Sequence, residues 1–250
     1  LANQNQKQAD IINSSANSLL VIINDILDLS KIKSGNFNLT YEKSDIYFIS
    51  EHVIELFSRR ANEKNIKLVF DIDKEVPLYI KTDGLRLKQV LSNLISNAIK
   101  FTPEEGTVHI SILLEKLEEN IATLKFKIED SGIGIKEEKL QSIFDPFIQL
   151  DNNSNKKFSG TGLGLSISNH IINSLGSKIE VQSRINEGSI FSFTLAFEVC
   201  EDSDLSQKEF ISNIKFKIDN KEDKLFEYIK RYIDLFGNIN NEDKNFDVLL

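Results

Sequence analysis

Two closely spaced glycine clusters are the strongest chemical signal in the sequence. Residues 130–134 read Asp-Ser-Gly-Ile-Gly after a strand-like segment, and residues 160–164 read Gly-Thr-Gly-Leu-Gly before a helix-like one. Glycines let the backbone approach a ligand, and a helix N-terminus offers free N–H groups and a favourable dipole to phosphate. The second cluster lacks the spacing of a dinucleotide fingerprint and the Gly-Lys-Ser/Thr of a P-loop. Either cluster alone is more typical of a tight turn.

Three polar residues lie on one face of the predicted helix 85–101. Asn93 and Asn97 are one turn apart, and Lys100 follows three residues later. An amide oxygen can ligate Mg²⁺, which usually takes few protein ligands in addition to phosphates and waters, and a lysine can meet phosphate as a point charge. Alone these residues would be a solvated helix face. Together with both glycine clusters, in this order, they predict a site for a magnesium nucleotide.

Alternating strand and helix patterns must position these residues. Apolar periodicity predicts four helices, at 12–30, 46–64, 85–101 and 163–175. Period-two alternation predicts strands at 68–72, 108–112, 124–128, 179–181 and 191–197, with 37–41 extended and a polar connection at 115–120. Strands in hairpin-like pairs with helices between them indicate an α+β sandwich, with helices on one face of a mixed sheet. The polar segment 147–160 is long enough to predict a lid.

Composition excludes several other classes. The chain has 250 residues, 40% of them hydrophobic and 27% charged, with a net charge of -8 and no basic cluster, so a nucleic-acid partner is not expected. It contains neither a signal pattern nor the roughly 20 apolar residues of a membrane span. The single cysteine, Cys200, fits a reducing compartment, and the cytoplasm is expected. Because the sequence has no methionine, it is expected to be a fragment of a longer protein.

Four segments in order resemble the boxes of sensor histidine kinases, within the gyrase, Hsp90, histidine kinase and MutL superfamily. They are 87–102 (asparagine box, preceded by Asp83 and Arg86), 130–134 (first glycine box), 143–147 (phenylalanine box) and 160–167 (second glycine box). The resemblance runs from about residue 10 to 198. It implies a Bergerat-type ATP-binding fold, a two-layer α/β sandwich with a mixed sheet, preceded by a long dimerisation helix and followed by a truncated βα unit.

The resemblance also implies roles for individual residues, with ATP and Mg²⁺ as cofactors. Asn97 would bind Mg²⁺, Lys100 would approach the phosphates, and Asp130 would accept a hydrogen bond from the exocyclic amine of adenine. A carboxylate can only accept, which favours adenine over guanine. The remaining expected nucleotide-binding residues are Gly132, Gly134, Lys156, Lys157, Gly160, Thr161, Gly162, Leu163 and Gly164. For the two lysines an ordinary solvated role is equally open. Phe144 and Phe147 are expected to support the lid.

Asn93 stands where related ATPases of the superfamily place a glutamate as general base. An amide cannot take a proton at neutral pH, so the site is poorly equipped to activate water. That suits a kinase whose acceptor is a neutral imidazole, already nucleophilic. The hypothesis is that Asn93 is catalytic and orients the incoming histidine.

The same resemblance divides the chain. Residues 1–35 are expected to be the second helix of a dimerisation and phosphotransfer hairpin, which 24–32 resembles, and 36–200 the catalytic domain. A linker at 201–211 would precede a receiver-like or other βα domain at 212–250, as in a hybrid kinase. The expected partners are a second copy, bound through the N-terminal helix and a helix missing upstream, and a response regulator or receiver domain. No direct membrane contact is expected from this segment, though tethering of the full-length protein stays open.

None of the three histidines, His52, His109 and His170, lies in a phosphoacceptor pattern such as Ser-His-Glu-Leu-Arg-Thr-Pro. The acceptor is therefore expected outside this segment. The predicted function is the ATP-binding core of a histidine kinase that transfers the γ-phosphoryl group to that histidine. A nucleotide-binding regulatory pseudokinase is the alternative. An ATP-hydrolysing clamp is a third interpretation, opposed by Asn93 and by the helix at 12–30.

Overall fold

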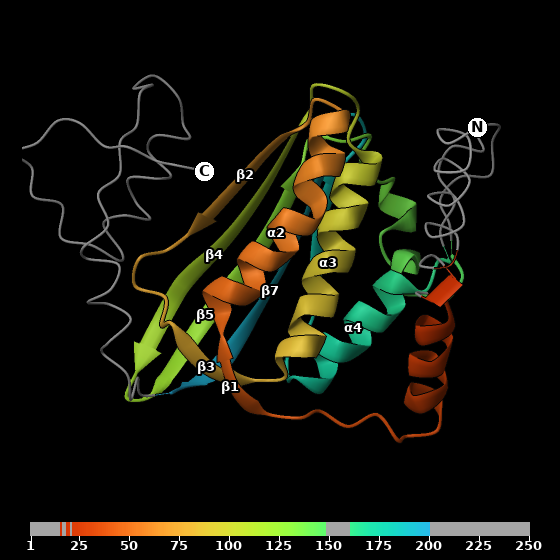
Figure 1. Ribbon diagram of the computed structural model, residues 1–250. Helices are drawn as coiled ribbons and strands as arrows, with labels where there is room; N and C mark the ends of the chain where they lie inside the picture. The colour runs from red at the N-terminus through yellow and green to blue at the C-terminus, as the bar shows by residue number, and fades with distance from the viewer. Residues whose placement is uncertain (1–15, 17–18, 21, 149–160, 201–250) are drawn as a thin grey trace, which may run out of the picture.

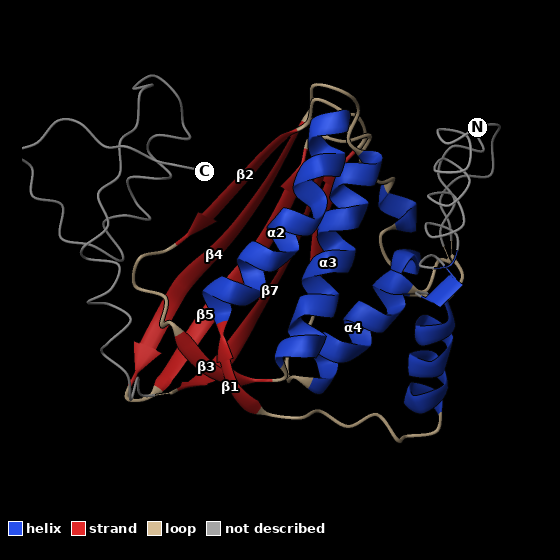
Figure 2. Cartoon of the chain, in the orientation of Figure 1, coloured by secondary structure: helices blue, strands red, loops and turns tan. Residues whose placement is uncertain are grey.

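A computed structural model describes residues 16, 19–20, 22–148 and 161–200 as one mixed sheet covered on one face by helices (Figures 1 and 2). This confirms the predicted α+β sandwich. The elements, in chain order, are β1 (Glu42–Asp45), α2 (Ile46–Glu63), β2 (Lys67–Ile72), β3 (Tyr79–Thr82), α3 (Gly84–Phe101), β4 (Thr107–Glu118), β5 (Ile121–Asp130), the short 3-10 turns η1 (Glu137–Lys139) and η2 (Ser142–Phe144), α4 (Gly164–Ser174), β6 (Glu180–Arg184) and β7 (Gly188–Val199).

The seven-stranded sheet has the order β1-β3-β7-β5-β4-β2, and β6 also pairs with β7. β4, β5 and β7 form its antiparallel centre, while β2 runs parallel to β4. A parallel pair needs a crossover, and here the connection from β2 to β4 includes β3 and α3. That crossover places α3 across the centre of the sheet, beside α2 and α4 (Figure 1).

Alternation along the central strands forms the core. In β5, Leu124, Phe126 and Ile128 are fully buried, while Lys125 and Lys127 alternate with them on the opposite face. The rings of Phe126 and Phe193 stack with centroids 4.8 Å apart. From the other layer, α3 contributes a row of buried aliphatic side chains: Leu87, Val90, Leu91, Leu94, Ile95 and Ile99. Burial of this stripe holds α3 against the sheet and leaves its polar face available for the site.

Capping residues fix both ends of α3. The Asp83 carboxylate accepts hydrogen bonds from the backbone N–H of Arg86 at 3.0 Å and of Thr40 at 2.9 Å. At the other end, the Lys64 ammonium donates to the carbonyl oxygens of Ile99 at 2.7 Å and of Thr102 at 2.6 Å. A cation at a helix C-terminus satisfies carbonyls that have no partner inside the helix.

Most predicted elements agree with the structure to within a few residues, with two differences. The polar connection predicted at 115–120 is wrong, because β4 continues to Glu118 and β5 begins at Ile121. Polar side chains are compatible with a strand there because the end of β4 is exposed to solvent and still pairs with β5. The strands β1 and β3 were not predicted, since four residues are too few to show alternation.

The segment preceding the sheet is helical over residues 22–33, and residues 36–41 are extended without ladder pairing. Within the described ranges, no helix has the length and apolarity that crossing a membrane requires. The linker predicted at 201–211 and the βα unit predicted at 212–250 lie outside the described residues.

Candidate functional site

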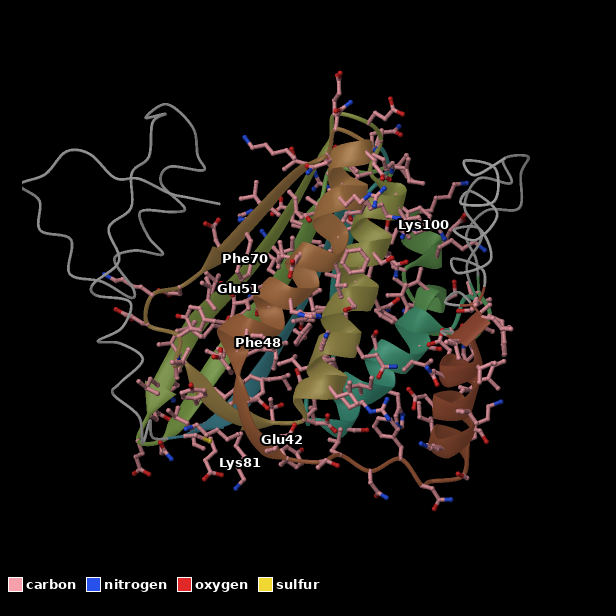
Figure 3. The ribbon with its side chains drawn as sticks, in the orientation of Figure 1. Glu42, Phe48, Glu51, Phe70, Lys81 and Lys100 are labelled. Atoms are coloured by element: carbon pink, nitrogen blue, oxygen red, sulfur yellow. The ribbon has the colours of Figure 1, made fainter. Side chains whose placement is uncertain are left out.

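The predicted polar face of α3 is present and partly accessible. Asn93, Asn97 and Lys100 are all half-buried, and α3 contacts α4 along this side. Lys100 lies near the C-terminal end of the helix (Figure 3), with its ammonium 4.8 Å from the centre of the Phe101 ring. The two amides and the ammonium therefore form one polar strip along α3, and Asn93 in this strip lies against Gly164 of the second glycine cluster.

A chain of hydrogen bonds orients the two amides. The Asn93 amide nitrogen donates to the hydroxyl of Ser168 on α4 at 2.9 Å, and the Asn97 amide nitrogen donates to the Asn93 oxygen at 3.5 Å. Both amide nitrogens are thus directed toward protein oxygens. The Asn97 oxygen is left to ligate a cation, which is the donor that Mg²⁺ takes from an amide.

Gly164 permits this approach of the two helices. A Cβ atom added there would lie 2.2 Å from the Asn93 amide oxygen and 2.8 Å from its amide carbon. Any larger residue would push α4 away from Asn93, or turn the amide out of its hydrogen bond to Ser168. Glycine at the first position of α4 therefore allows the close contact between this helix and the Asn93 amide.

The N-terminus of α4 differs from those of α2 and α3. Asp45 and Asp83 cap the two earlier helices through their side chains, whereas Leu163, the residue before α4, provides no side-chain cap. Its first N–H groups, with the helix dipole, favour an anion. The hydroxyl of Thr161 lies beside this end and accepts from the Leu163 N–H at 3.2 Å. The arrangement suits a phosphate group.

Asp130 is held in a fixed orientation at the end of β5. Its carboxylate accepts the N–H of Gly132 at 2.8 Å and a backbone N–H of Ser189. Only 6% of the residue is exposed. Burial raises the pKa of Asp130 to about 6, against the two backbone hydrogen bonds, which lower it. The side chain is thus a buried acceptor, oriented before any ligand binds.

Gly134 closes the first glycine cluster in a backbone conformation that side chains rarely adopt, with φ +69°. A Cβ atom there would lie 1.9 Å from the carbonyl oxygen of Arg184. The Asn186 N–H also donates to the Ile133 carbonyl at 2.9 Å, which joins the cluster to the β6–β7 turn. The cluster is therefore fixed from behind by backbone contacts that exclude a side chain.

The phenylalanine segment meets the second glycine cluster through its backbone. Phe144 packs against the core, and the Phe147 N–H donates to the Gly162 carbonyl at 2.9 Å. The Phe147 ring is 63% exposed. The predicted lid support by these rings stays a prediction, because most of the lid lies outside the described residues, as do Lys156, Lys157 and Gly160.

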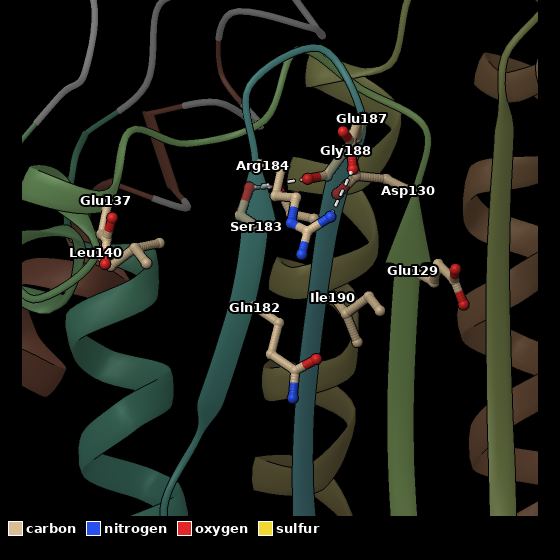
Figure 4. Close-up of a pocket in the computed structure, with 11 residues that line it drawn as sticks. Glu129, Asp130, Glu137, Leu140, Gln182, Ser183, Arg184, Glu187, Gly188 and Ile190 are labelled. Carbon is tan, nitrogen blue, oxygen red and sulfur yellow. Dashed lines mark hydrogen bonds and ion pairs between the residues drawn. The ribbon is translucent and has the colours of Figure 1, made fainter.

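A groove of about 610 Å³ lies on the face of the sheet away from α3 (Figure 4). It reaches the first glycine cluster through Asp130 and its neighbours Ser189 and Arg184, and Glu129, Gln182 and Gly188 also line it. The polar strip of α3 and the start of α4 do not line it. The groove is therefore behind the candidate site and is not the site itself.

The three histidines each contact neighbours in the fold. The His109 ring lies 2.7 Å from the Asp71 carboxylate across β4 and β2, and the His170 ring packs edge-on against Phe37 at 5.2 Å. His52 lies 5.9 Å from the Phe48 ring on the same helix. Among the described residues, no cluster of His, Cys, Asp or Glu could hold a metal. The donor set fits a cation brought by a nucleotide, with one amide oxygen from the protein.

Sequence reasoning missed two residues that the fold brings to the site. Ser168 fixes Asn93, and Asp25 accepts the Thr161 hydroxyl at 3.3 Å. The position of Ser168, one turn after Gly164 on the same helix face, was a usable signal. Nothing in the sequence indicated Asp25, because its contact spans 136 positions along the chain.

Comparison with known proteins is consistent with this geometry. Residues 82–199 match the family described as histidine kinase-, DNA gyrase B-, and HSP90-like ATPase. The chain is 39% identical over 198 residues to the autoinducer 2 sensor kinase/phosphatase LuxQ of Vibrio vulnificus, a match that covers 78% of this chain and 23% of LuxQ. The chain thus spans about a quarter of the length of this curated relative.

Two solved structures share the fold. The catalytic domain of histidine kinase ThkA, in a nucleotide-free form, is 32% identical with a TM-score of 0.52, covering 64% of this chain and 96% of that one. Full-length ShkA in complex with AMPPNP is 24% identical with a TM-score of 0.68, covering 94% of this chain and 49% of that one. At that identity ShkA supports the fold alone.

Proposed function

Because this chain belongs to the family of histidine kinase-, DNA gyrase B- and HSP90-like ATPases, as the ATP-binding catalytic domain of a histidine kinase, we propose that it phosphorylates a histidine with Mg-ATP. The observation that carries the proposal is the meeting of α3 and α4. There Asn93, which accepts a hydrogen bond from the Asn97 amide, lies against Gly164 at a helix N-terminus without a side-chain cap. The accepting histidine would belong to a segment or partner outside residues 1–250.

The nucleotide would be held at both ends. The buried Asp130 carboxylate would accept from the adenine amino group, while the first turn of α4 and the Thr161 hydroxyl would receive the phosphates. Lys100 would add a point charge, and the Asn97 oxygen would ligate Mg²⁺, which shields the phosphates when bound.

The chemical step would be an in-line displacement. A neutral ring nitrogen of the acceptor histidine attacks the γ-phosphorus; the P–N bond forms, the bond to the β-phosphate oxygen breaks, and ADP leaves. The phosphorylated imidazole then releases the proton of its other ring nitrogen to water. The protein's own contribution is positioning and charge stabilisation. Asn93 cannot act as a base, so it would orient the imidazole, and its bond to Ser168 keeps its amide in place.

Binding and transfer can be tested in sequence. Calorimetry should detect Mg-ATP but not Mg-GTP, because a carboxylate acceptor selects the amino group of adenine. Labelled ATP should then phosphorylate an added hairpin that carries the acceptor histidine. Absence of binding would point to a pseudokinase, and steady hydrolysis without transfer would point to a clamp ATPase.

The Asn93→Ala variant should bind ATP with unchanged affinity but transfer the phosphoryl group slowly. Unchanged transfer by this variant would overturn the proposed role of Asn93 in orienting the histidine.

The proposed setting is a dimeric signalling protein in the cytoplasm, of the hybrid type. The helix 22–33 and the residues before it expose Leu19, Leu20, Ile22, Ile23, Ile26 and Leu27, and this stripe suits packing against a second copy. ThkA's recorded complex with the response regulator TrrA supports a receiver as the downstream partner.

The dimer surface can be tested at Leu27, in the exposed stripe. Leu27→Glu in the longer protein should shift sedimentation from dimer to monomer. An unchanged dimer would contradict this assignment of the stripe.

A further inference from the structure

The helix 22–33 is attached to the catalytic domain through a buried carboxylate. Asp28 is 7% exposed, and its two carboxylate oxygens accept hydrogen bonds from two nitrogens of the Arg86 guanidinium at 2.7 and 3.1 Å. The Gln89 amide nitrogen adds a third bond at 2.9 Å. Burial alone would raise the pKa of Asp28, but the Arg86 and Gln89 hydrogen bonds outweigh it and lower the pKa. This bidentate salt bridge lies at the start of α3.

The neighbouring linker strengthens this attachment. The Phe37 ring lies beneath the Arg86 guanidinium at 4.9 Å and against the His170 ring on α4. The Thr40 N–H donates to the Asp83 carboxylate, which also caps α3. The helix is thus held by side-chain and backbone bonds, and its orientation toward the site is defined.

One turn before Asp28, the same helix face reaches the proposed phosphate site. Asp25 accepts a hydrogen bond from the Thr161 hydroxyl at 3.3 Å. Thr161 in turn accepts from the Leu163 N–H, at the uncapped N-terminus of α4. A carboxylate therefore lies where the proposed function requires the phosphates of ATP to approach.

We propose that the helix 22–33 is an autoinhibitory element that lowers the affinity of the site for ATP. Asp28, Arg86 and Gln89 anchor the helix, and Asp25 occupies the Thr161 hydroxyl and repels the like-charged triphosphate. This inference rests on the proposed function. Binding energies are reciprocal, so ATP must weaken the helix contact by the same factor by which the contact weakens ATP binding. Nucleotide binding thereby frees the helix from the catalytic domain.

Calorimetry of the full 250-residue chain with Mg-AMPPNP tests the contact. Asp25→Asn removes the charge and keeps the shape, so it should bind about fivefold more tightly, as expected for loss of one partly screened repulsion. Asp28→Asn should act in the same direction by weakening the anchor. Glu118→Gln is the matched control, because it removes one negative charge from the exposed Lys116–Glu118 pair far from the site.

The outcomes separate the two proposals. If the wild-type chain binds and both aspartate variants match Glu118→Gln, the inhibitory contact is overturned while the proposed function stands. If neither the wild-type chain nor Asp25→Asn binds, both are overturned. Tighter binding by Asp25→Asn, with no change in Glu118→Gln, supports the inference.

A distance measurement gives a second readout. Spin labels at Asn24→Cys and Glu63→Cys, in a Cys200→Ser background, report the position of the helix relative to α2. A narrow distance distribution without nucleotide should broaden on addition of Mg-AMPPNP, and Asp28→Asn should broaden it without nucleotide. A distribution that Mg-AMPPNP leaves unchanged would overturn the coupling.

Discussion

At the residue scale, the candidate site depends on polar groups that other protein groups orient in advance. The Asp130 carboxylate is fixed by two backbone N–H groups, and the Asn97 amide is fixed through Asn93 and Ser168. Each oxygen offered to a ligand is therefore paired with a bond that fixes its direction. Preorganised groups of this kind lose little freedom on binding, which raises affinity without further contacts.

Asp130 should leave a signature in stability against pH. Its folded pKa of about 6 exceeds the ordinary 3.8, so between these values the native state holds a proton that the unfolded chain has released. Stability relative to Asp130→Asn should therefore fall as pH rises from about 4 to 6, by about 3 kcal/mol in all. Urea unfolding of both proteins at several pH values measures this. A difference that does not change with pH would contradict the buried carboxylate; the exposed Glu118→Gln should follow the wild type.

Replacing Ser168 should weaken the binding of a magnesium nucleotide. Ser168→Ala removes the acceptor of the Asn93 amide, so the Asn97 oxygen loses its defined direction. The expected result is about tenfold weaker binding of Mg-AMPPNP, equal to the loss of one hydrogen bond, with Mg-free AMPPNP unaffected. Calorimetry with and without Mg²⁺ separates the two. Ser58→Ala, at a half-buried serine on α2, is the control, and equal losses in both metal conditions would count against this role.

At the element scale, α3 connects the core to the site. One face carries the buried aliphatic row and the other the two asparagines and Lys100, while Asp83 and Lys64 fix its ends. α4 has a different construction, with an uncapped N-terminus placed against Asn93. The two helices therefore contribute different groups to the site, since α3 supplies side chains and α4 supplies backbone N–H groups.

The C-terminal cap of α3 gives a prediction at this scale. Lys64→Met removes the cation from the Ile99 and Thr102 carbonyls and should cost about 2 kcal/mol of unfolding free energy, the typical value of charge-assisted hydrogen bonds. Chemical denaturation measures the loss. Lys74→Met, at an exposed lysine, should change stability little. Equal effects of the two substitutions would show that the cap contributes nothing specific.

At the scale of the whole molecule, the sheet and its helices form one core that does not depend on the segments outside it. All the buried hydrophobic residues of the described chain lie between Ile46 and Phe197. The helix 22–33 adds polar contacts to this body through Asp25 and Asp28, and Leu29 packs against the edge of the core. This division favours a domain that carries the nucleotide site and a separately attached helix that regulates it.

The predicted domain 36–200 should therefore fold by itself. A protein limited to these residues keeps the whole buried core, so it should unfold in a single cooperative transition and bind Mg-AMPPNP at least as tightly as the full chain. Circular dichroism during heating and calorimetry check the two parts. A broad, non-cooperative transition would show that the boundaries are misplaced.

The sequence alone determined the elements whose patterns are long and regular. The stripe of α3 and the alternation of β5 follow from burying one face, and glycine clusters mark places where the backbone must come close to something else. The sandwich fold and the common face of Asn93 and Asn97 could be predicted this way, and the histidine kinase family followed from the resemblance of four ordered segments to that family's boxes. The short strands β1 and β3 could not, because neighbours across the sheet decide whether four residues pair.

Only the tertiary structure decided which distant groups meet. The contacts of Asn93 with Ser168, of Asp28 with Arg86 and of Asp25 with Thr161 join positions 58 to 136 residues apart, and no local pattern encodes them. The N-terminus of α4, which has no side-chain cap, becomes part of a candidate site only because α3 packs beside it, and the pKa of Asp130 rises only because the fold removes it from water. Periodicity records which face of an element is buried, whereas the partner on that face is set by the packing of the whole chain.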